Sequence, residues 1–473
     1  MRKNIREISP IDVYKLLPRT NCKECGESNC MAFATKLVNG ERTMEECPPL
    51  LRTEYASTYA QLQELLAPPI RTVIIGTGEK AVKVGGKYVV YRHELTYHNP
   101  PPIFIDIDDS LPADELEQRV RAIETFSFNY IGRTLTLNGI ALRCTSQDPV
   151  TYTAAAERVI ALTDYPLILC TFNRQVLDSA LQKVSNRRPL IYAATQENWA
   201  SMAELALRFQ CPLAVAGSQD VALLRSLVRT LHAYGLSDLV LDPGTGYDGG
   251  LARTIHLFSA IRRAGCRGGD ELLGFPLLAT PLSVWTGSEI SRDITAWKEA
   301  CLAAMLISRY ADLLIMHSLD GWVLLPQLIW RFNLYTDPRK PVSVEPGLRT
   351  FGTPGRDSPV LLTTNYALTY FTVESDLKAA KVDCYLIVVD TSGISVESAV
   401  AGRYLTADRI ATALKDSGVI DLVNHTFLIL PGLAARLSGE TEEATGWHIL
   451  VGPKDSSGLP KYLKEHWPPT EDR

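Results

Sequence analysis

The sequence lacks the features of several large protein classes. No uninterrupted apolar run approaches the roughly 18 residues that cross a bilayer, so a membrane-spanning helix is excluded. The 48 basic and 53 acidic residues leave a net charge of −5, so neither nucleic acid nor an anionic membrane is expected as a partner. The first residues, MRKNIREISP, are charged and contain no apolar signal segment, and we therefore expect a cytoplasmic protein.

Low-complexity tracts and internal repeats are missing as well. The chain has 46% hydrophobic and 21% charged residues, which is ordinary for a globular protein. This composition excludes a disordered, collagen-like or coiled-coil chain. The length of 473 residues indicates about three folded units.

The ten cysteines are unevenly distributed, because Cys22, Cys25, Cys30 and Cys47 all lie near the start of the chain. A cytosolic protein does not need disulfides, so this group indicates metal ligation. Four thiolates can hold a [4Fe–4S] cluster or a structural zinc ion. Zinc modules usually pair two short Cys-x2-Cys knuckles, and only one is present here. The spacing therefore favours the iron–sulfur cluster, with zinc and free thiols as alternatives. The other six cysteines lie in apolar runs and are interpreted as buried small hydrophobes.

The middle of the chain, residues 96–334, alternates eight short apolar runs with longer amphipathic stretches. This alternation predicts parallel strands joined by crossover helices. Eight such units match a closed (β/α)8 TIM barrel, and an open doubly wound sheet is the alternative. The runs begin at Ile103, Ile140, Leu167, Leu190, Leu213, Leu239, Phe275 and Leu313.

Smaller segments flank this central region. Residues 1–60 form the cysteine-bearing domain, and residues 61–95 are predicted as a linker with two short strands, 72–76 and 87–91. Residues 335–358 are rich in proline and glycine, so we predict a second linker there. The strand–helix pattern resumes over residues 359–473, which predicts an open-sheet, Rossmann-like or flavodoxin-like α/β domain.

Polar residues lie near the ends of several barrel strands, where barrel enzymes hold their catalytic groups. Single polar residues are common at such positions without catalysis, so we assign no active site to the barrel. The segment 244–249 superficially fits a dinucleotide fingerprint, but it follows the sixth strand and is predicted to be a tight loop. The residues near strand ends are Asp106, Asp108, Asn173, Asp242 and His317.

The C-terminal strands each end in small, turn-forming or hydrogen-bonding residues, in segments 363–365, 391–396, 431–432 and 452–458. Ligands of open parallel sheets bind at the carboxyl ends of the strands. These four loops could line a broad, shallow ligand with many amide groups, although such loops also occur without a ligand. No Asp-x-His-x-x-Gly motif is present, and His425 and His448 are interpreted as structural.

Three segments in fixed order support a family assignment: the four-cysteine segment, the barrel, and C-terminal stretches at 361–371, 390–396 and 446–453. In this combination the chain resembles the large (gamma) subunit of the corrinoid iron–sulfur protein of the acetyl-CoA synthase/decarbonylase system, over essentially its whole length. The resemblance implies that Cys22, Cys25, Cys30 and Cys47 hold a [4Fe–4S] cluster. It also implies that the barrel docks a small (delta) subunit and that residues 359–473 bind a corrinoid (B12 derivative).

The resemblance implies that the corrinoid is held base-off, without a histidine ligand to cobalt, and that no side chain is itself catalytic. The corrinoid contacts carried over from the family are Thr363, Thr369, Gly393, Ile394, Ser395, Val396, Pro431, Gly432, Gly452 and Pro453.

The activity implied is that of a methyl carrier in the reductive acetyl-CoA (Wood–Ljungdahl) pathway, a component of a corrinoid-dependent methyltransferase system. Cob(I)amide accepts a methyl group from a methyl-tetrahydropterin (methyltetrahydrofolate or methyltetrahydrosarcinapterin) on a separate methyltransferase. It delivers the group to the nickel centre of acetyl-CoA synthase, and the cluster reduces inactive cob(II)amide. The alternatives are an iron–sulfur electron-transfer or reductive-activator protein, a pterin-dependent methyltransferase acting in its own barrel, and a zinc-stapled scaffold.

Overall fold

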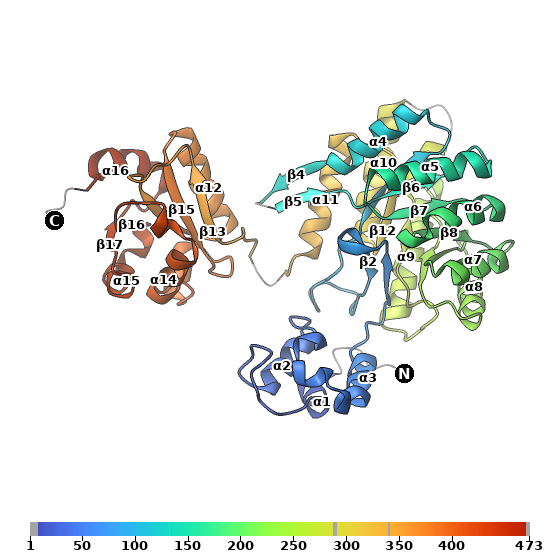
Figure 1. The fold of residues 1–473 in the computed structure, drawn as a ribbon, viewed down its shortest axis with the longest axis horizontal. Helices are drawn as coiled ribbons and strands as arrows, with labels where there is room; N and C mark the ends of the chain where they lie inside the picture. Colours follow the sequence, from blue (N-terminus) through green and yellow to red (C-terminus); the bar gives the residue numbers. More distant parts are fainter. Residues whose placement is uncertain (1–7, 132, 287–290, 339–340, 470–473) are drawn as a thin grey trace. The chain divides into compact units, whose positions relative to one another are not determined.

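A computed structural model describes residues 8–131, 133–286, 291–338 and 341–469 (Figure 1). The chain divides into two compact units. The first comprises residues 1–128 and 135–337, and the second comprises residues 129–134 and 338–473. None of the described helices is both long and apolar enough to cross a membrane.

The cysteine-bearing segment folds around three short helices, α1 (Pro10–Leu16), α2 (Cys30–Val38) and α3 (Ala56–Leu65). Ser9 begins α1 with a capping box, and the Asn29 side chain caps α2 by accepting a hydrogen bond from the N–H of Ala32. Val13, Phe33 and Leu62 are almost fully buried between the helices. This core is small, so bound metal would add substantially to the stability of the segment.

The central region is a closed parallel barrel, as predicted, and not an open sheet. Its strands follow one another in chain order around the ring, and β12 pairs with β3. The ring closes between β10 and β11, where the N–H of Leu241 donates to the carbonyl of Pro276 at 2.8 Å. The strands are β3 (Ile103–Asp108), β6 (Gly139–Arg143), β7 (Leu167–Cys170), β8 (Leu190–Ala194), β9 (Leu213–Ala216), β10 (Leu239–Asp242), β11 (Leu278–Ala279) and β12 (Leu313–Met316).

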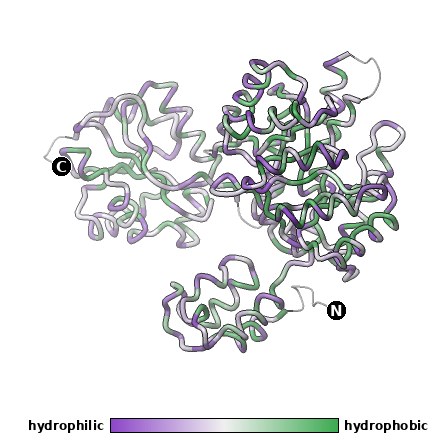
Figure 2. The backbone as a smooth tube through the Cα atoms, turned by 45° about the vertical axis from the view of Figure 1, so that its right-hand side comes forward, coloured by the Kyte–Doolittle hydropathy of each residue, from purple (hydrophilic) through white to green (hydrophobic). Residues whose placement is uncertain are grey.

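Amphipathic helices surround the barrel, and hydrophobic stretches run through its middle (Figure 2). Several helices begin where the side chain of Asp148, Asn173 or Asp220 accepts hydrogen bonds from first-turn N–H groups. The helices are α4 (Ala113–Thr125), α5 (Pro149–Leu162), α6 (Arg174–Val184), α7 (Trp199–Phe209), α8 (Val221–Ala233), α9 (Leu251–Cys266), α10 (Arg292–Ser308) and α11 (Gly321–Tyr335).

A two-stranded hairpin belongs to the barrel core. β1 (Thr72–Ile75) pairs antiparallel with β2 (Val82–Gly85), and Val73, Ile75 and Val84 are buried with side chains from the barrel interior. The first predicted strand is therefore confirmed. The second predicted strand, at residues 87–91, is wrong, because the chain turns back earlier, at Gly78. Lys87 instead forms a buried ion pair with Asp312.

The C-terminal unit is an open sheet with strand order β13-β15-β14-β16-β17. Its four later strands are parallel and follow the flavodoxin-like order 2-1-3-4. The strands are β13 (Gly347–Phe351), β14 (Val360–Thr364), β15 (Cys384–Val389), β16 (Phe427–Leu430) and β17 (His448–Val451). The helices of this unit are α12 (Ala367–Ala379), α13 (Val396–Ala401), α14 (Ala407–Asp416), α15 (Ser438–Thr445) and α16 (Leu459–His466).

Strand β13 corrects the predicted linker at residues 335–358. It pairs antiparallel with β15 from Gly347 opposite Val388 to Phe351 opposite Cys384. An edge strand bonds on one side only, so it tolerates flanking proline and glycine that a central strand would not. The high proline and glycine content of this segment therefore led to the prediction of a linker where β13 lies. The two-stranded sheet of β4 (Ser127–Tyr130) and β5 (Arg133–Thr136) was likewise not predicted.

Candidate functional site

The four N-terminal cysteines lie on one loop–helix–loop segment. Cys22 and Cys25 are in the loop before α2, Cys30 is the first residue of α2, and Cys47 follows the 3-10 helix η2 (Met44–Glu46). Cys22 is exposed and Cys25 partly exposed, whereas Cys30 and Cys47 are buried. The set therefore extends from the surface of the segment into its small core.

Cys47 is within electrostatic range of the other three thiols. Burial raises the pKa of Cys47, and the nearby Cys25, Cys30 and Cys22 raise it further. Among the residues that the structure describes, no three Cys, His, Asp or Glu side chains are close enough to hold a single metal ion.

The loop that carries Cys22 has an unusual backbone. Asn21 and Lys23 both have positive φ, 49° and 63°, which non-glycine residues rarely adopt. The Asn21 side chain accepts a hydrogen bond from the N–H of Cys30 at 2.9 Å, which ties the loop to the start of α2. Strained backbone of this kind is found at ligand-binding loops. A soft donor set on a wrapped loop fits an iron–sulfur cluster.

A second candidate site is a cavity of about 340 Å³ in the C-terminal unit. It lies at the carboxyl ends of β14 and β16, the neighbouring strands between which the strand order reverses. Open α/β sheets bind their ligands at this switch point. The lining is mostly leucine, valine and proline with a few hydroxyl groups, which is the composition of a site for a large, partly apolar ligand.

Seven of the ten residues predicted to contact the corrinoid line this cavity. They are Thr363, Thr369, Ser395, Val396, Pro431, Gly452 and Pro453. Gly393, Ile394 and Gly432 do not line it, but the two glycines allow the loops to approach closely. Gly393 has a φ of +74°, and a Cβ there would lie 2.7 Å from the carbonyl oxygen of Pro341. A Cβ on Gly432 would lie 2.7 Å from the carbonyl oxygen of Gly452.

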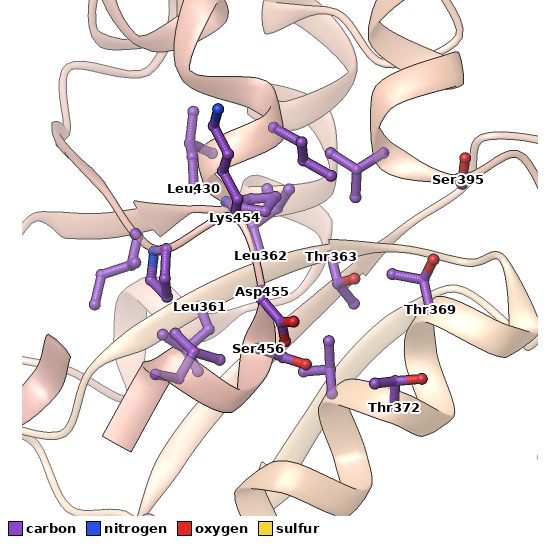
Figure 3. Close-up of a pocket in the computed structure, with 18 of the residues that line it drawn as sticks. Leu361, Leu362, Thr363, Thr369, Thr372, Ser395, Leu430, Lys454, Asp455 and Ser456 are labelled. Atoms are coloured by element: carbon purple, nitrogen blue, oxygen red, sulfur yellow. The ribbon is translucent and has the colours of Figure 1, made fainter. Parts of the chain in front are cut away.

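The polar groups of the cavity come from four segments (Figure 3). Thr363 lies near the end of β14, and Thr369 and Thr372 come from α12. Ser395 and Glu397 lie at the start of α13, and Lys454, Asp455 and Ser456 lie in the loop after β17. Sequence reasoning placed this last loop at the site but did not single out Lys454, Ser456 or Thr372. The helical spacing of Thr369 and Thr372 is the signal that could have identified the second threonine.

Asn365 organises the loop beside the cavity, and sequence reasoning did not identify this role. Its buried side-chain oxygen accepts hydrogen bonds from the N–H of Thr391 and of Gly393, both at 3.0 Å, and from the Thr391 hydroxyl. Its side-chain nitrogen donates to Asp390 at 3.0 Å. One amide thus fixes the turn that presents Ser395 and Val396 to the cavity.

The two histidines of the C-terminal sheet lie away from this cavity. His425 precedes β16 and its Nε2 is 2.9 Å from the carbonyl oxygen of Ser358, while its ring packs against Trp467. His448 is the first residue of β17. Both histidines are therefore at the amino ends of parallel strands, the edge opposite the cavity. Within the part of the chain that the structure describes, the cavity lining contains no histidine.

The polar residues at the barrel mouth form a closed ionic network. The buried Asp106 carboxylate contacts His317 Nδ1 at 2.6 Å and Arg143 Nε at 3.1 Å, and Arg119 adds a longer contact. Burial would raise the pKa of Asp106, but His317 and the two arginines hold it below its usual value. Because both oxygens of the Asp106 carboxylate have partners, we interpret the network as a structural link between β3, β6 and β12.

The other three predicted strand-end residues also have structural partners. Asp108 pairs with Arg143 at 3.3 Å and accepts a hydrogen bond from the N–H of Ser110 at 2.9 Å. Asn173 caps α6, and Asp242 accepts a hydrogen bond from the Tyr192 hydroxyl at 2.6 Å. The segment 244–249 begins as a loop after β10, as predicted, and runs into the 3-10 helix η7 (Asp248–Gly250); the N–H of Gly246 donates to the Thr254 hydroxyl.

Comparison with known proteins covers nearly the whole chain. A family model for the CO dehydrogenase/acetyl-CoA synthase delta subunit matches residues 72–463, and an Fe-S cluster model matches residues 17–49. The acetyl-CoA decarbonylase/synthase complex subunit gamma of Methanosarcina acetivorans is 44% identical over 466 residues, 98% of this chain and 99% of that protein. The gamma subunit of Methanothermobacter thermautotrophicus is 44% identical over 459 residues, 97% of this chain and 98% of that protein.

Among solved structures, dihydropteroate synthases are similar to part of this chain. The enzyme from Thermus thermophilus covers 55% of this chain and 99% of its own, with 16% identity and a TM-score of 0.38. The enzyme from Xanthomonas albilineans in complex with 7,8-dihydropteroate covers 50% of this chain and 94% of its own, with 18% identity and a TM-score of 0.38.

Proposed function

The chain belongs to the family of acetyl-CoA decarbonylase/synthase gamma subunits, and we propose that it is the corrinoid-bearing methyl carrier of that complex. In this proposal Cys22, Cys25, Cys30 and Cys47 hold a [4Fe–4S] cluster, and the C-terminal unit holds a corrinoid. When bound, the corrinoid supplies a cobalt ion that accepts and releases the methyl group. The donor would be a methyl-tetrahydropterin on a separate methyltransferase and the acceptor the nickel centre of acetyl-CoA synthase.

The cavity at the carboxyl ends of β14 and β16 carries the proposal. It combines apolar side chains, which suit the faces of a macrocycle, with hydroxyls and backbone groups, which suit its amide arms. Thr363 is only 2% exposed and lies near the end of a central strand, so its position is fixed by the sheet. The absence of histidine from the described lining supports binding without a nitrogen ligand from the protein.

In this proposal the role of the chain is therefore to bind, orient and shield the corrinoid. Thr369 and Thr372 offer hydroxyls from one helix turn, and Asn365 holds the 390–393 turn in the conformation that places Ser395. The cysteine segment would supply electrons for reductive repair of the cobalt centre, which explains why one chain carries both sites.

The first test measures the iron and cobalt content of the protein. Protein purified without oxygen should contain about four iron atoms and about one cobalt atom per chain, with the absorbance of both groups. Cys25→Ser should lose most of the iron and keep the cobalt. The matched control Cys211→Ser, a buried barrel cysteine, should keep both. Iron without cobalt, even after incubation with a B12 derivative, would overturn the proposal in favour of an electron-transfer protein.

The second test addresses the cavity itself. Thr369→Leu fills the lining with a larger apolar group and should lower bound cobalt several-fold while leaving iron unchanged. Thr412→Leu, at an exposed threonine on α14 of the same unit, is the control and should leave cobalt unchanged. Equal cobalt content in the two variants would count against this cavity as the corrinoid site.

A further inference from the structure

The cysteine segment presents its four thiols on two arms. The first arm, residues 22–30, carries three of the cysteines, and the second arm, residues 43–47, ends at Cys47. Helix α2 and the loop after it separate the two arms along the chain. A contact between the arms that does not involve the bound group would therefore restrict how far the thiols can move apart.

A buried carboxylate lies on the first arm. Glu27 follows Cys25 by two residues, and its side chain is only 8% exposed, so it needs counter-charges. Its Oε1 atom has two of them. The Lys36 ammonium is at 2.8 Å, and the Arg42 guanidinium is at 3.0 Å through both Nε and Nη2. Lys36 belongs to α2, which continues directly from the first arm, whereas Arg42 lies in the loop beyond α2.

Arg42 also contacts the second arm. Its Nη1 donates to the Glu46 carboxylate at 2.5 Å, and Glu46 immediately precedes Cys47. The other Glu46 oxygen accepts a hydrogen bond from the N–H of Thr43 at 2.8 Å, which fixes the direction of the carboxylate. One guanidinium therefore joins Glu27 to Glu46. The planar fork of arginine can hold two carboxylates in one geometry, which the single ammonium of lysine does poorly.

The position of the guanidinium ties this bridge to the ligand turn itself. A Cβ on Gly26 would lie 3.6 Å from Arg42 Nη2, so the guanidinium lies against the residue that follows Cys25. The N–H of Gly26 donates to the carbonyl of Lys23 at 2.9 Å, which closes the turn between Cys22 and Cys25.

The importance of the bridge is geometric. The Arg42 and Glu46 side chains are 33% and 36% exposed, and an ion pair with that exposure adds little to stability alone. It does, however, connect the residue before Cys47 to the turn that carries Cys25. A bound group is released when its ligand loops open locally, and a contact between the loops opposes that opening.

We infer that Arg42 is a positioning residue of the cysteine site, which holds the second arm against the first and thereby slows loss of the bound group. The inference rests on the proposed function in one respect, that the four cysteines hold an iron–sulfur cluster. Groups that orient metal ligands without touching the metal commonly change metal retention by about 10–100-fold.

The test uses the full chain, purified without oxygen and loaded with iron and sulfide. Release of iron to a ferrous chelator is followed by absorbance. Arg42→Gln should release iron at least about 10-fold faster than the wild type. Arg42→Lys keeps the charge but not the bridge, so it should also release iron faster. Lys36→Gln is the matched control, because it removes one cation from the same Glu27 oxygen and leaves the bridge in place. It should release iron at the wild-type rate.

Two further measurements separate bridging from a general loss of stability. If Arg42 acts through Glu46, Glu46→Gln should speed release as Arg42→Gln does, and the double variant should be no faster than either single variant. The glutamine keeps an oxygen for the N–H of Thr43. The electron paramagnetic resonance signal of the reduced cluster should be broader in Arg42→Gln and unchanged in Lys36→Gln, because loosened arms hold the cluster in a wider range of geometries.

Equal release from Arg42→Gln and the wild type would overturn the inference. Release from Lys36→Gln as fast as from Arg42→Gln would also overturn it, because the lost charge alone would then explain both. Additive effects of Arg42→Gln and Glu46→Gln would show that the two residues do not act as one bridge. The metal content of the wild type tests the proposed function separately. Zinc in place of iron would refute the cluster, and the same variants, with zinc release measured, would still decide whether Arg42 bridges the arms.

Discussion

Three charged residues are buried together where the hairpin meets the barrel. The Lys87 ammonium lies 2.8 Å from one Asp312 oxygen, and Arg262 contacts the other. All three side chains are almost fully buried. Burial would raise the pKa of Asp312, but Arg262 and Lys87 lower it, so the carboxylate stays charged. Lys87, Arg262 and Asp312 come from the segment after β2, from α9 and from the residue before β12, so the group joins three distant parts of the chain.

Removing the shared carboxylate should therefore be costly. Asp312→Asn would leave two buried cations without a counter-charge, and we expect a loss of about 3–5 kcal/mol in the free energy of unfolding. Chemical denaturation measures it. Glu117→Gln, which breaks the exposed pair with Arg121, is the control and should cost less than about 1 kcal/mol. A comparable small loss in both variants would show that Asp312 does not balance these charges.

Lys87 should also give the protein a recognisable pH dependence. Burial lowers its pKa to about 8, partly offset by Asp312, against about 10.4 in an unfolded chain. Between these values the unfolded chain binds more protons than the folded one, so stability rises with pH. Tyr97 and Tyr335 face the same ammonium group, with ring centres 5.1 and 4.9 Å away.

The measurement compares the wild type with Lys87→Met. From pH 8 to about pH 10.4, the free energy of unfolding of the wild type should rise by on the order of 3 kcal/mol relative to the variant. Tyrosine titrations are common to both proteins and cancel in the difference. Parallel stability curves over this range would contradict the assigned protonation of Lys87.

At the scale of elements, the turn after β15 depends on a single side chain. Asn365 satisfies the N–H groups of Thr391 and Gly393 near the cavity, while the Thr391 hydroxyl donates to the carbonyl of Ile394 at 2.7 Å. Asn365→Ala would leave the two buried N–H donors unpaired. We expect a loss of about 2–3 kcal/mol and a several-fold fall in bound cobalt.

The control for this turn is Asn424→Ala. Asn424 is an exposed residue of the same unit whose side chain accepts one hydrogen bond from Arg356. It should change neither stability nor cobalt content beyond about 0.5 kcal/mol and the error of the assay. If Asn365→Ala retains full cobalt although it is destabilised, the turn has no part in the site.

Elements with strong local patterns could be predicted from the sequence. All eight barrel strands and the four parallel strands of the C-terminal sheet lie at the predicted apolar runs. Buried parallel strands are continuous apolar runs, which makes them visible in sequence. β13 and β2 were missed because both strands are short and contain glycine, and β13 is in addition an edge strand that pairs only with β15.

The site was only partly predictable for the same reason. The loops after the strands follow from the fold, so Thr363, Ser395 and Pro431 could be placed at the sheet edge. The contacts of Asn365 join residues 25 to 28 positions apart, and no local pattern indicates them. The four N-terminal cysteines could be grouped from their spacing in the sequence alone, because closely spaced cysteines are typical of metal ligands.

At the scale of the whole molecule, the barrel begins earlier in the chain than the predicted boundary at residue 96. The β1–β2 hairpin and Lys87 lie before residue 96, yet they complete the barrel core and its buried ion group. A fragment of residues 96–338 should aggregate or unfold at low denaturant. A fragment of residues 68–338 should show one cooperative transition, which circular dichroism would record. Equal stability of the two fragments would mean that the hairpin adds nothing to the barrel.

The hairpin has a further consequence for synthesis of the chain. Its apolar strand residues, Val73, Ile75 and Val84, leave the ribosome long before β12, whose Leu313 and Ile315 complete the shared core. At a synthesis rate of about 5–20 residues per second, tens of seconds pass between the emergence of the hairpin and that of β12. During that interval the apolar side chains of the hairpin can form non-native contacts. Production of this protein should accordingly be sensitive to translation speed and to chaperones that bind nascent chains.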